Sequence, residues 1–241
     1  MNTFVFSYCV SIFVQIVAFV IQLYGSMLIV PRSLTLLKSA LYVEFYVSIV
    51  EFIVYLWIGN SLSNYEVIMS KRYLDWFLTT NGLIISLTLL FIFLKQREEF
   101  MKEQKNKKAL TYTPNNNIKH IAENNKHELK EMFLSNNLML ICGLLGEKQI
   151  LPKIYSFSLG FLFFIYYFRI LYESFAKHSH SGKILFYIIT FIWSLYGIFH
   201  LLPTVSKNIG YNILDLLSKN IFGVFMVYLL LYPEAFFFLP R

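Results

Sequence analysis

Seven apolar stretches recur along this chain of 241 residues, and turn signals or charged segments separate them. A helix needs about 20 mostly apolar residues to cross the hydrocarbon core of a bilayer. A soluble domain could not hide this much apolar surface, since 57% of the residues are hydrophobic and only 15% are charged. The sequence therefore predicts one all-α membrane domain over residues 1–241, a bundle of seven transmembrane helices: Thr3–Val30, Leu37–Ile58, Arg72–Leu94, Met132–Gly146, Ile154–Ser174, Lys183–Leu202 and Asn208–Leu231.

The segment 95–131 is the one part of the chain with the composition of a solvated loop. It holds 15 of the 35 charged residues, including nine of the 21 lysines and arginines. We expect its first part to extend the third helix into solvent and Pro114–Asn117 to break that helix. Loops rich in lysine and arginine stay in the cytoplasm. The segment 95–131 follows the third predicted helix, so the N-terminus is predicted to lie on the opposite, outer side of the membrane. The net charge of +7 then reflects topology, and no nucleic-acid partner is expected.

Lys219 lies in the middle of the last apolar stretch. An ionisable side chain at that depth costs at least ~2.5–3.5 kcal/mol, so it needs a partner or a chemical role. Asp215 precedes it by one helical turn, and Asp75 lies in the third stretch on one predicted face with Arg72, Thr79 and Ser86. The spacing makes Asp75 and Asp215 the expected partners of Lys219.

The second stretch carries two further carboxylates. Glu44, Ser48 and Glu51 are spaced by four and three residues, which places them on one helix face. Rows of acidic side chains attract cations into pores, so these residues are candidates to line an ion path. The alternative is that these carboxyl groups are protonated and only form hydrogen bonds between helices. The same path would include Ser11, Asn212 and Asn220.

The remaining reactive side chains form no pattern of their own. Cys9 and Cys142 fall inside apolar stretches, which is typical of small core residues and does not indicate a disulfide. No spacing of histidines or cysteines indicates a metal site, and no nucleophile triad or phosphate-binding loop is present. An enzyme is therefore not expected.

The motifs RYLDWFLTT, around Asp75, and DLLSK, ending at Lys219, resemble those of the microbial (type I) rhodopsins. The acidic second helix and the set Asp75, Thr79 and Ser86 look most like the rhodopsins of giant viruses of algae. The resemblance implies that Lys219 holds all-trans retinal as a Schiff base and that Asp75 is the counterion and proton acceptor. It also implies that Asp215 is the second counterion and that Arg72 acts in gating or proton release.

The same resemblance implies a retinal pocket. Two positions depart from the family pattern, because Gly197 replaces the usual proline and His200 stands where an aromatic residue is common. Leu83 suggests absorption of green rather than blue light. No site residue is assigned to the fifth predicted helix. The expected pocket residues are Trp76, Thr80, Leu83, Met139, Cys142, Gly143, Trp193, Tyr196, Gly197, His200 and Ser218.

Light-driven ion transport is the function that these motifs imply. In the best-known pumps a carboxylate stands at the position of Ser86, and a hydroxyl cannot store a proton at neutral pH. We therefore favour a light-gated cation channel, with an outward proton pump as the alternative, in which Glu44 or Glu51 supplies the proton. A sensory photoreceptor that signals through the segment 95–131 is the third candidate. The resemblance further implies a homo-oligomer in the lipid bilayer, a host cell membrane if the chain is viral.

Overall fold

The computed structural model describes residues 2–105 and 115–233, and all regular elements in these ranges are helical. One 3-10 turn, Arg32–Leu34, precedes the helix Thr35–Gly59, and another, Ala176–His178, precedes the helix His180–Leu201. A π-helical segment, Leu216–Ile221, joins the last two helices. The α-helices are α1 (Thr3–Met27), α2 (Thr35–Gly59), α3 (Tyr65–Lys105), α4 (Ile118–Asn124), α5 (Lys126–Glu147), α6 (Lys153–Ser174), α7 (His180–Leu201), α8 (Thr204–Asp215) and α9 (Phe222–Leu231).

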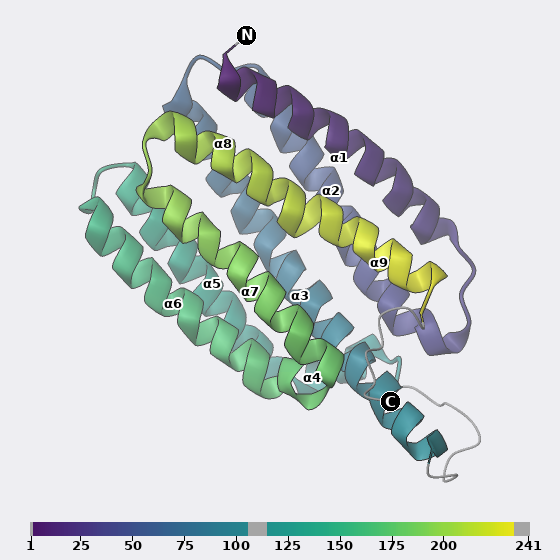
Figure 1. The fold of residues 1–241 in the computed structure, drawn as a ribbon. Coiled ribbons are helices and arrows are strands. Elements are labelled where there is room, and N and C mark those ends of the chain that lie inside the picture. Colours follow the sequence, from purple (N-terminus) through teal and green to yellow (C-terminus); the bar gives the residue numbers. More distant parts are fainter. Residues whose placement is uncertain (1, 106–114, 234–241) are drawn as a thin grey trace.

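The helices lie side by side in a bundle (Figure 1), and their contacts close into a ring. Helix α1 packs on α2, α2 on α3, α3 on α5, α5 on α6, α6 on α7 and α7 on α8, and both α8 and α9 return to α1. The helices begin where the sequence supplies caps. Asn2 and Ser179 accept hydrogen bonds from the first turns of α1 and α7, and Pro152 and Pro203 stand directly before α6 and α8.

Six helical segments of the described chain are long and apolar enough to cross a membrane. They correspond to all the predicted spans except Met132–Gly146. That span falls in α5, whose first turns are charged and which carries Asn136 and Asn137. The all-helical architecture is confirmed, while the count of seven spans stays a prediction.

The segment 95–131 is more helical than the sequence indicated. Helix α3 continues to Lys105, as predicted, and projects beyond the bundle (Figure 1). The far end of the segment also folds into α4 and the start of α5, because Asn117 caps α4 and Ile121 packs inward. Residues 115–117 are not helical, and the predicted break at Pro114 lies outside the described residues.

Polar and apolar side chains are distributed as expected for a bundle in lipid. Large apolar residues such as Phe13, Leu162 and Phe191 are exposed, whereas charged residues such as Lys219 and Glu51 are buried. The expectation that both cysteines belong to the core is wrong for Cys9, which is exposed on α1. An apolar run alone does not distinguish the inner from the outer face of a membrane helix.

Candidate functional site

Lys219, Asp75 and Asp215 meet at the centre of the bundle, as their spacing predicts. Lys219 Nζ donates a 2.6 Å hydrogen bond to Asp75 Oδ2 and lies 3.6 Å from Asp215 Oδ1. Each side chain is at most 1% exposed. A buried cation is tolerated at this depth only beside negative charge, so the three residues depend on one another.

Arg72 adds a second cation to this cluster. Its NH1 donates to Asp215 Oδ2 at 3.0 Å and to the Tyr55 hydroxyl at 3.0 Å, and its NH2 donates to Asn212 Oδ1. The Tyr55 hydroxyl in turn donates to Asp215 Oδ2 at 2.8 Å. Two cations therefore face two carboxylates, which limits the electrostatic cost of burying all four groups.

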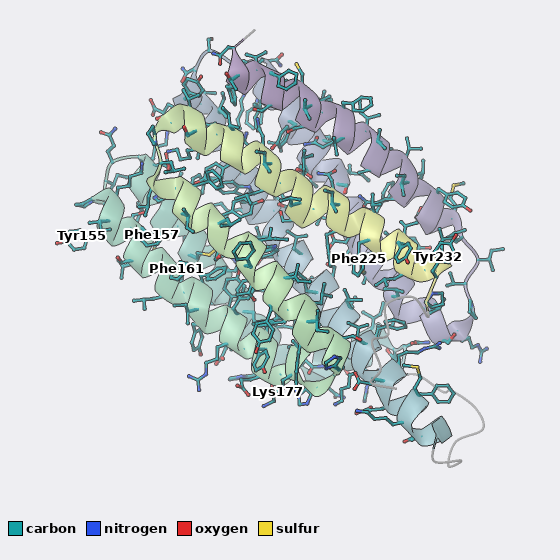
Figure 2. The ribbon with its side chains drawn as sticks, viewed as in Figure 1. Tyr155, Phe157, Phe161, Lys177, Phe225 and Tyr232 are labelled. Carbon is teal, nitrogen blue, oxygen red and sulfur yellow. The ribbon has the colours of Figure 1, made fainter. Side chains whose placement is uncertain are left out.

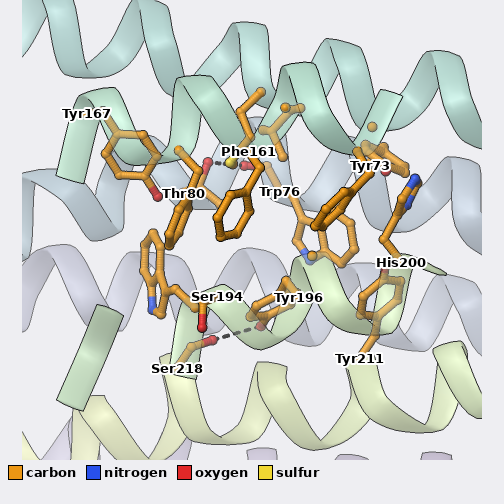
Figure 3. A pocket seen from close by; sticks show the side chains of 18 of the residues that line it. Tyr73, Trp76, Thr80, Phe161, Tyr167, Ser194, Tyr196, His200, Tyr211 and Ser218 are labelled. Carbon is orange, nitrogen blue, oxygen red and sulfur yellow. Dashed lines mark hydrogen bonds between the residues drawn. The ribbon is translucent and has the colours of Figure 1, made fainter. Parts of the chain in front are cut away.

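Asp215 is also held by aromatic side chains from two other helices. Tyr196 of α7 donates to Asp215 Oδ1 at 2.8 Å, and Trp76 of α3 donates to the same oxygen at 3.3 Å. The Tyr196 hydroxyl also lies 2.9 Å from Ser218 Oγ (Figure 3). Hydrogen bonds from several elements fix the position of this carboxylate before any ligand binds.

The π-helical segment explains why adjacent residues can serve different partners. Ser218, Lys219 and Asn220 are consecutive and all buried. Lys219 reaches Asp75 of α3, while Asn220 Nδ2 donates to Glu51 Oε2 of α2 at 2.9 Å. π-Helical turns often occur at functional sites, where they re-aim side chains.

An apolar cavity extends from Lys219 between α3, α5, α6, α7 and α8. Tyr167 and His200 lie at opposite ends of the view of this cavity in Figure 3. The Tyr167 hydroxyl is buried and has no hydrogen-bond partner among the described residues. Predicted pocket residues that line the cavity are Trp76, Thr80, Leu83, Met139, Gly143, Trp193, Tyr196, Gly197, His200 and Ser218.

Two glycines let aromatic rings approach the wall of this cavity. A Cβ on Gly143 would lie 2.5 Å from the Tyr73 hydroxyl oxygen, and one on Gly197 would lie 3.1 Å from the ring of Phe157. Side chains at these positions would displace the rings, so glycine at both positions lets the rings keep their places. Cys142, also predicted for the pocket, is not among the lining residues, and its carbonyl accepts a 2.7 Å hydrogen bond from Ser156 of α6.

Glu44 and Glu51 lie in a row of buried polar groups beside the central cluster. Both are completely buried. Glu51 Oε1 accepts a 3.4 Å hydrogen bond from Gln15 of α1, and Glu44 Oε1 accepts one from Ser86 of α3. Glu44 Oε2 has no hydrogen-bond partner in the described chain. We call the groups Gln15, Gln22, Glu44, Ser48, Glu51, Ser86 and Asn220 the polar row.

The other predicted polar residues have separate partners. Ser48 exchanges hydrogen bonds of 2.9 and 3.1 Å with Gln22 of α1. Ser11 is buried, but its hydroxyl donates to the carbonyl of Ser7 in its own helix. Thr79 likewise donates to the carbonyl of Asp75 at 2.9 Å. Within the described part of the chain, Ser11 and Thr79 therefore face the interior without a side-chain hydrogen bond to either glutamate.

Sequence reasoning missed Tyr55, Gln15 and Gln22. Tyr55 follows Glu51 by four residues and continues the polar face of α2. Gln15 and Gln22 follow Ser11 by four and eleven residues and form an equivalent face on α1. Helical spacing from residues already singled out was the available signal.

A second charged cluster lies where α5 ends: Glu147 is outside the candidate membrane spans, and His200 and Lys207 lie near the ends of two of them. Glu147 accepts hydrogen bonds of 2.6 and 2.7 Å from Lys207, and His200 Nδ1 lies 3.1 Å from Glu147 Oε1. Burial alone would raise the pKa of Glu147, but the hydrogen bonds from His200 and Lys207 outweigh it and hold that pKa below its ordinary value. His200 lines the apolar cavity, and its contact with Glu147 stands between that cavity and a polar cavity lined by Glu147 and Lys207.

Comparison with known protein families gives a match over nearly the whole chain. The family described as bacteriorhodopsin-like protein matches residues 2–232. A search of curated protein sequences finds no match.

Three solved structures illustrate the likeness in fold. The viral rhodopsin OLPVRII is 24% identical, with a TM-score of 0.73, over 98% of this chain and 100% of that one. The blue light-absorbing proteorhodopsin from Med12 is 19% identical, with a TM-score of 0.71, over 97% and 98%. Halorhodopsin, a light-driven chloride pump, is 15% identical, with a TM-score of 0.63, over 95% and 96%. Because the family match spans nearly the whole sequence, the chain belongs to the bacteriorhodopsin-like family, the microbial rhodopsins, and is a multi-pass integral membrane protein.

Proposed function

We propose that this microbial rhodopsin holds all-trans retinal on Lys219 and uses light to open a path for cations through its polar row. Microbial rhodopsins bind retinal. The cavity beside Lys219 fits such a ligand, since aromatic and aliphatic side chains surround it and a single amine stands at its boundary with the charged cluster. The bound group would supply absorption of visible light and a change of shape inside the cavity.

The cluster around Lys219 would hold and move one proton. Asp75 Oδ2 accepts the hydrogen bond from Lys219 Nζ, so a proton on that nitrogen has a direct acceptor 2.6 Å away. Asp215 is already fixed by hydrogen bonds from Tyr55, Tyr196 and Arg72 and is less available for this transfer. Asp75 would therefore receive the proton, and Asp215 would keep its charge near Lys219.

Two buried carboxylates outside that cluster are the observation that carries the channel proposal. Glu44 and Glu51 face neutral amide and hydroxyl groups of α1, α3 and the π-helical segment. Such a row can be hydrated when helices separate, and carboxyl groups that ionise in contact with the water favour cations over anions. Lys219 and Asn220 are adjacent, so a shift of the backbone at Lys219 would be transmitted to Glu51.

An outward proton pump is the second candidate, and one contact favours it. Ser86 stands at the position where the best-known pumps of the family carry a proton-donating carboxylate. Its hydroxyl donates a hydrogen bond to Glu44 Oε1. Glu44 could therefore return a proton toward Lys219 from the inner side. The contact between Ser86 and Glu44 supports a proton donor on α2 in place of one on α3.

Topology and assembly belong to the same proposal. We infer seven spans with the N-terminus outside, in a homo-oligomer, and a host membrane if the protein is viral. What supports this orientation is the basic segment 95–131, whose described parts, 95–105 and 115–131, lie at the end of the bundle opposite the N-terminus of α1 (Figure 1).

Photocurrents under voltage clamp test the proposal. A channel gives a light-dependent current that reverses sign when the cation gradient and the voltage are reversed. A pump gives outward current at all voltages, and that result would overturn the channel proposal. The variant Lys219→Ala, illuminated with retinal present, is the control for currents that do not depend on the pigment.

A further inference from the structure

A second apolar cavity adjoins the proposed retinal cavity and lies between α3, α7 and the π-helical segment with α9. The two cavities share Leu83, Trp193 and Ser218, so they meet next to Lys219. Its lining is almost wholly aliphatic and aromatic and contains no charged side chain. The channel and pump proposals make no use of this space.

The second cavity is lined in part by residues on the lipid-facing surface. Ile188 of α7 and Ile221 at the end of the π-helical segment both line it, and each is 50% exposed. On the other side, Leu83 and Leu87 of α3 are buried. The space therefore extends from the outer surface between α7 and the last helix to the inner cavity.

The other walls of the retinal cavity are less suited to the passage of an apolar molecule. Toward α1 and α2 lie the charges of Arg72, Asp75 and Asp215. Toward the end of α5, the Glu147 cluster separates the cavity from the polar one. Moving an apolar chain past buried charges would replace their hydrogen bonds with contacts that cannot satisfy them.

Stacked rings occupy the wall between α6 and α7. Phe157, Phe161 and Phe164 follow one another with centroid distances of 5.4 and 5.3 Å, and Figure 2 shows the first two on α6. The position of Gly197 on α7 lies against Phe157 and Phe161, with only 3.1 and 3.5 Å from an added Cβ to the two rings. An aromatic stack in contact with the neighbouring backbone leaves little room for passage.

We propose that the second cavity is a lateral portal, through which retinal, an apolar polyene aldehyde dissolved in the bilayer, passes between Ile188 and Ile221 to reach Lys219. The portal rests on the proposed function, because it presupposes that Lys219 is the attachment site. Its aliphatic walls match a polyene, and its inner mouth at Ser218 is adjacent to the amine.

The rate of pigment formation tests the portal. Apoprotein in bilayers is mixed with all-trans retinal, and the visible band is followed with time. Ile188→Trp and Ile221→Trp should form the pigment about tenfold more slowly, which corresponds to ~1.4 kcal/mol of added barrier. Both should reach the wild-type band position and final absorbance, because neither residue lines the inner cavity. Ile221→Ala should accelerate formation.

Matched controls use equally exposed isoleucines that do not line either cavity. Ile198 of α7 is 52% exposed and Ile213 of α8 is 51% exposed. Ile198→Trp and Ile213→Trp should form the pigment at the wild-type rate. Equal slowing in these controls, or wild-type rates in both portal variants, would overturn the portal while leaving retinal binding intact.

Two further outcomes complete the test. If Phe161→Ala accelerates pigment formation and Ile221→Ala does not, retinal passes between α6 and α7 and the portal is wrong. If wild-type protein forms no visible band with retinal, the proposed function fails, and the portal fails with it. The two failures are therefore distinguished by the wild-type spectrum.

Discussion

Lys219 Nζ donates a 2.6 Å hydrogen bond to Asp75 Oδ2, while the other oxygen of Asp75 has no hydrogen-bond partner among the described residues. Asp215 differs, because both of its oxygens accept hydrogen bonds from neighbouring side chains. The two carboxylates near one lysine are thus unequal. Asp75 can take up a proton without losing an existing network, and Asp215 is suited to hold its charge in place.

Lys219→Ala should abolish the visible band that forms with retinal, because no amine remains at the centre of the bundle. The measurement is the absorption spectrum of membranes after addition of all-trans retinal. Lys207→Ala is a matched control, since Lys207 is also buried and paired with a carboxylate, and it should keep the band. A covalently held visible pigment in Lys219→Ala would contradict the assignment of the site.

Glu51→Gln should reduce the photocurrent of a channel about tenfold, if loss of one buried charge removes ~1.4 kcal/mol of favourable cation interaction. The amide keeps the shape of the side chain and can still meet Asn220 and Gln15. Single-cell photocurrents, normalised to the amount of pigment, measure the effect. Unchanged current in Glu51→Gln would exclude this carboxylate from the conducting path.

Glu44→Gln distinguishes the two transport mechanisms by a different measurement. In a pump that uses Glu44 as donor, the amide cannot supply a proton, so return of the dark absorption after a flash should slow by about tenfold or more. In a channel the dark recovery should change little while the current changes. Ser86→Ala is the companion variant, because it removes the hydroxyl that contacts Glu44 and leaves the carboxylate.

Tyr55→Phe should lower the free energy of unfolding by about 1–3 kcal/mol. The charged carboxylate of Asp215 loses the buried hydrogen bond that the Tyr55 hydroxyl donates, and Arg72 loses that hydroxyl as an acceptor. Thermal or denaturant unfolding in detergent measures the change. Tyr42→Phe on the same helix is the control, since Tyr42 is 49% exposed and its hydroxyl makes only a 3.3 Å hydrogen bond. Equal effects of both substitutions would argue against a special role for Tyr55.

Glu147 should make the stability of the protein vary with pH in the acid range. His200 and Lys207 hold the pKa of Glu147 below its ordinary value of 4.5. The ionised carboxylate therefore makes its full contribution to the free energy of unfolding above pH 4.5. The contribution is lost as the pH falls from 4.5 through the lower pKa of the folded state. Wild-type protein should therefore be more stable than Glu147→Gln at pH 7, and the difference should shrink below pH 4.5.

Unfolding transitions recorded from pH 7 to pH 3 measure this dependence. Glu66→Gln is the control, because Glu66 is 78% exposed in its ion pair with Lys148 and should change stability by less than ~1 kcal/mol. A constant difference between wild-type protein and Glu147→Gln across this range would show that the charge of Glu147 does not stabilise the fold.

Helical spacing predicted much of the site from the sequence. Asp75, Asp215 and Lys219 were expected to meet, because a buried cation needs carboxylates and these lie on polar faces of apolar helices. Cys9 shows where the same reasoning fails. A small residue in an apolar run can face lipid or core equally well, and only packing against neighbouring helices decides which.

The sequence alone determined that the chain is a helical membrane bundle with a charged centre, because apolar runs of spanning length and a central lysine allow few other folds. Tertiary structure decided which groups share each carboxylate. Tyr55 and Asp215 are 160 positions apart, and the π-helical turn that aims Lys219 at Asp75 and Asn220 at Glu51 has no local signature. Such contacts depend on how the helices rotate and pack against one another, and periodicity within one helix does not contain that information.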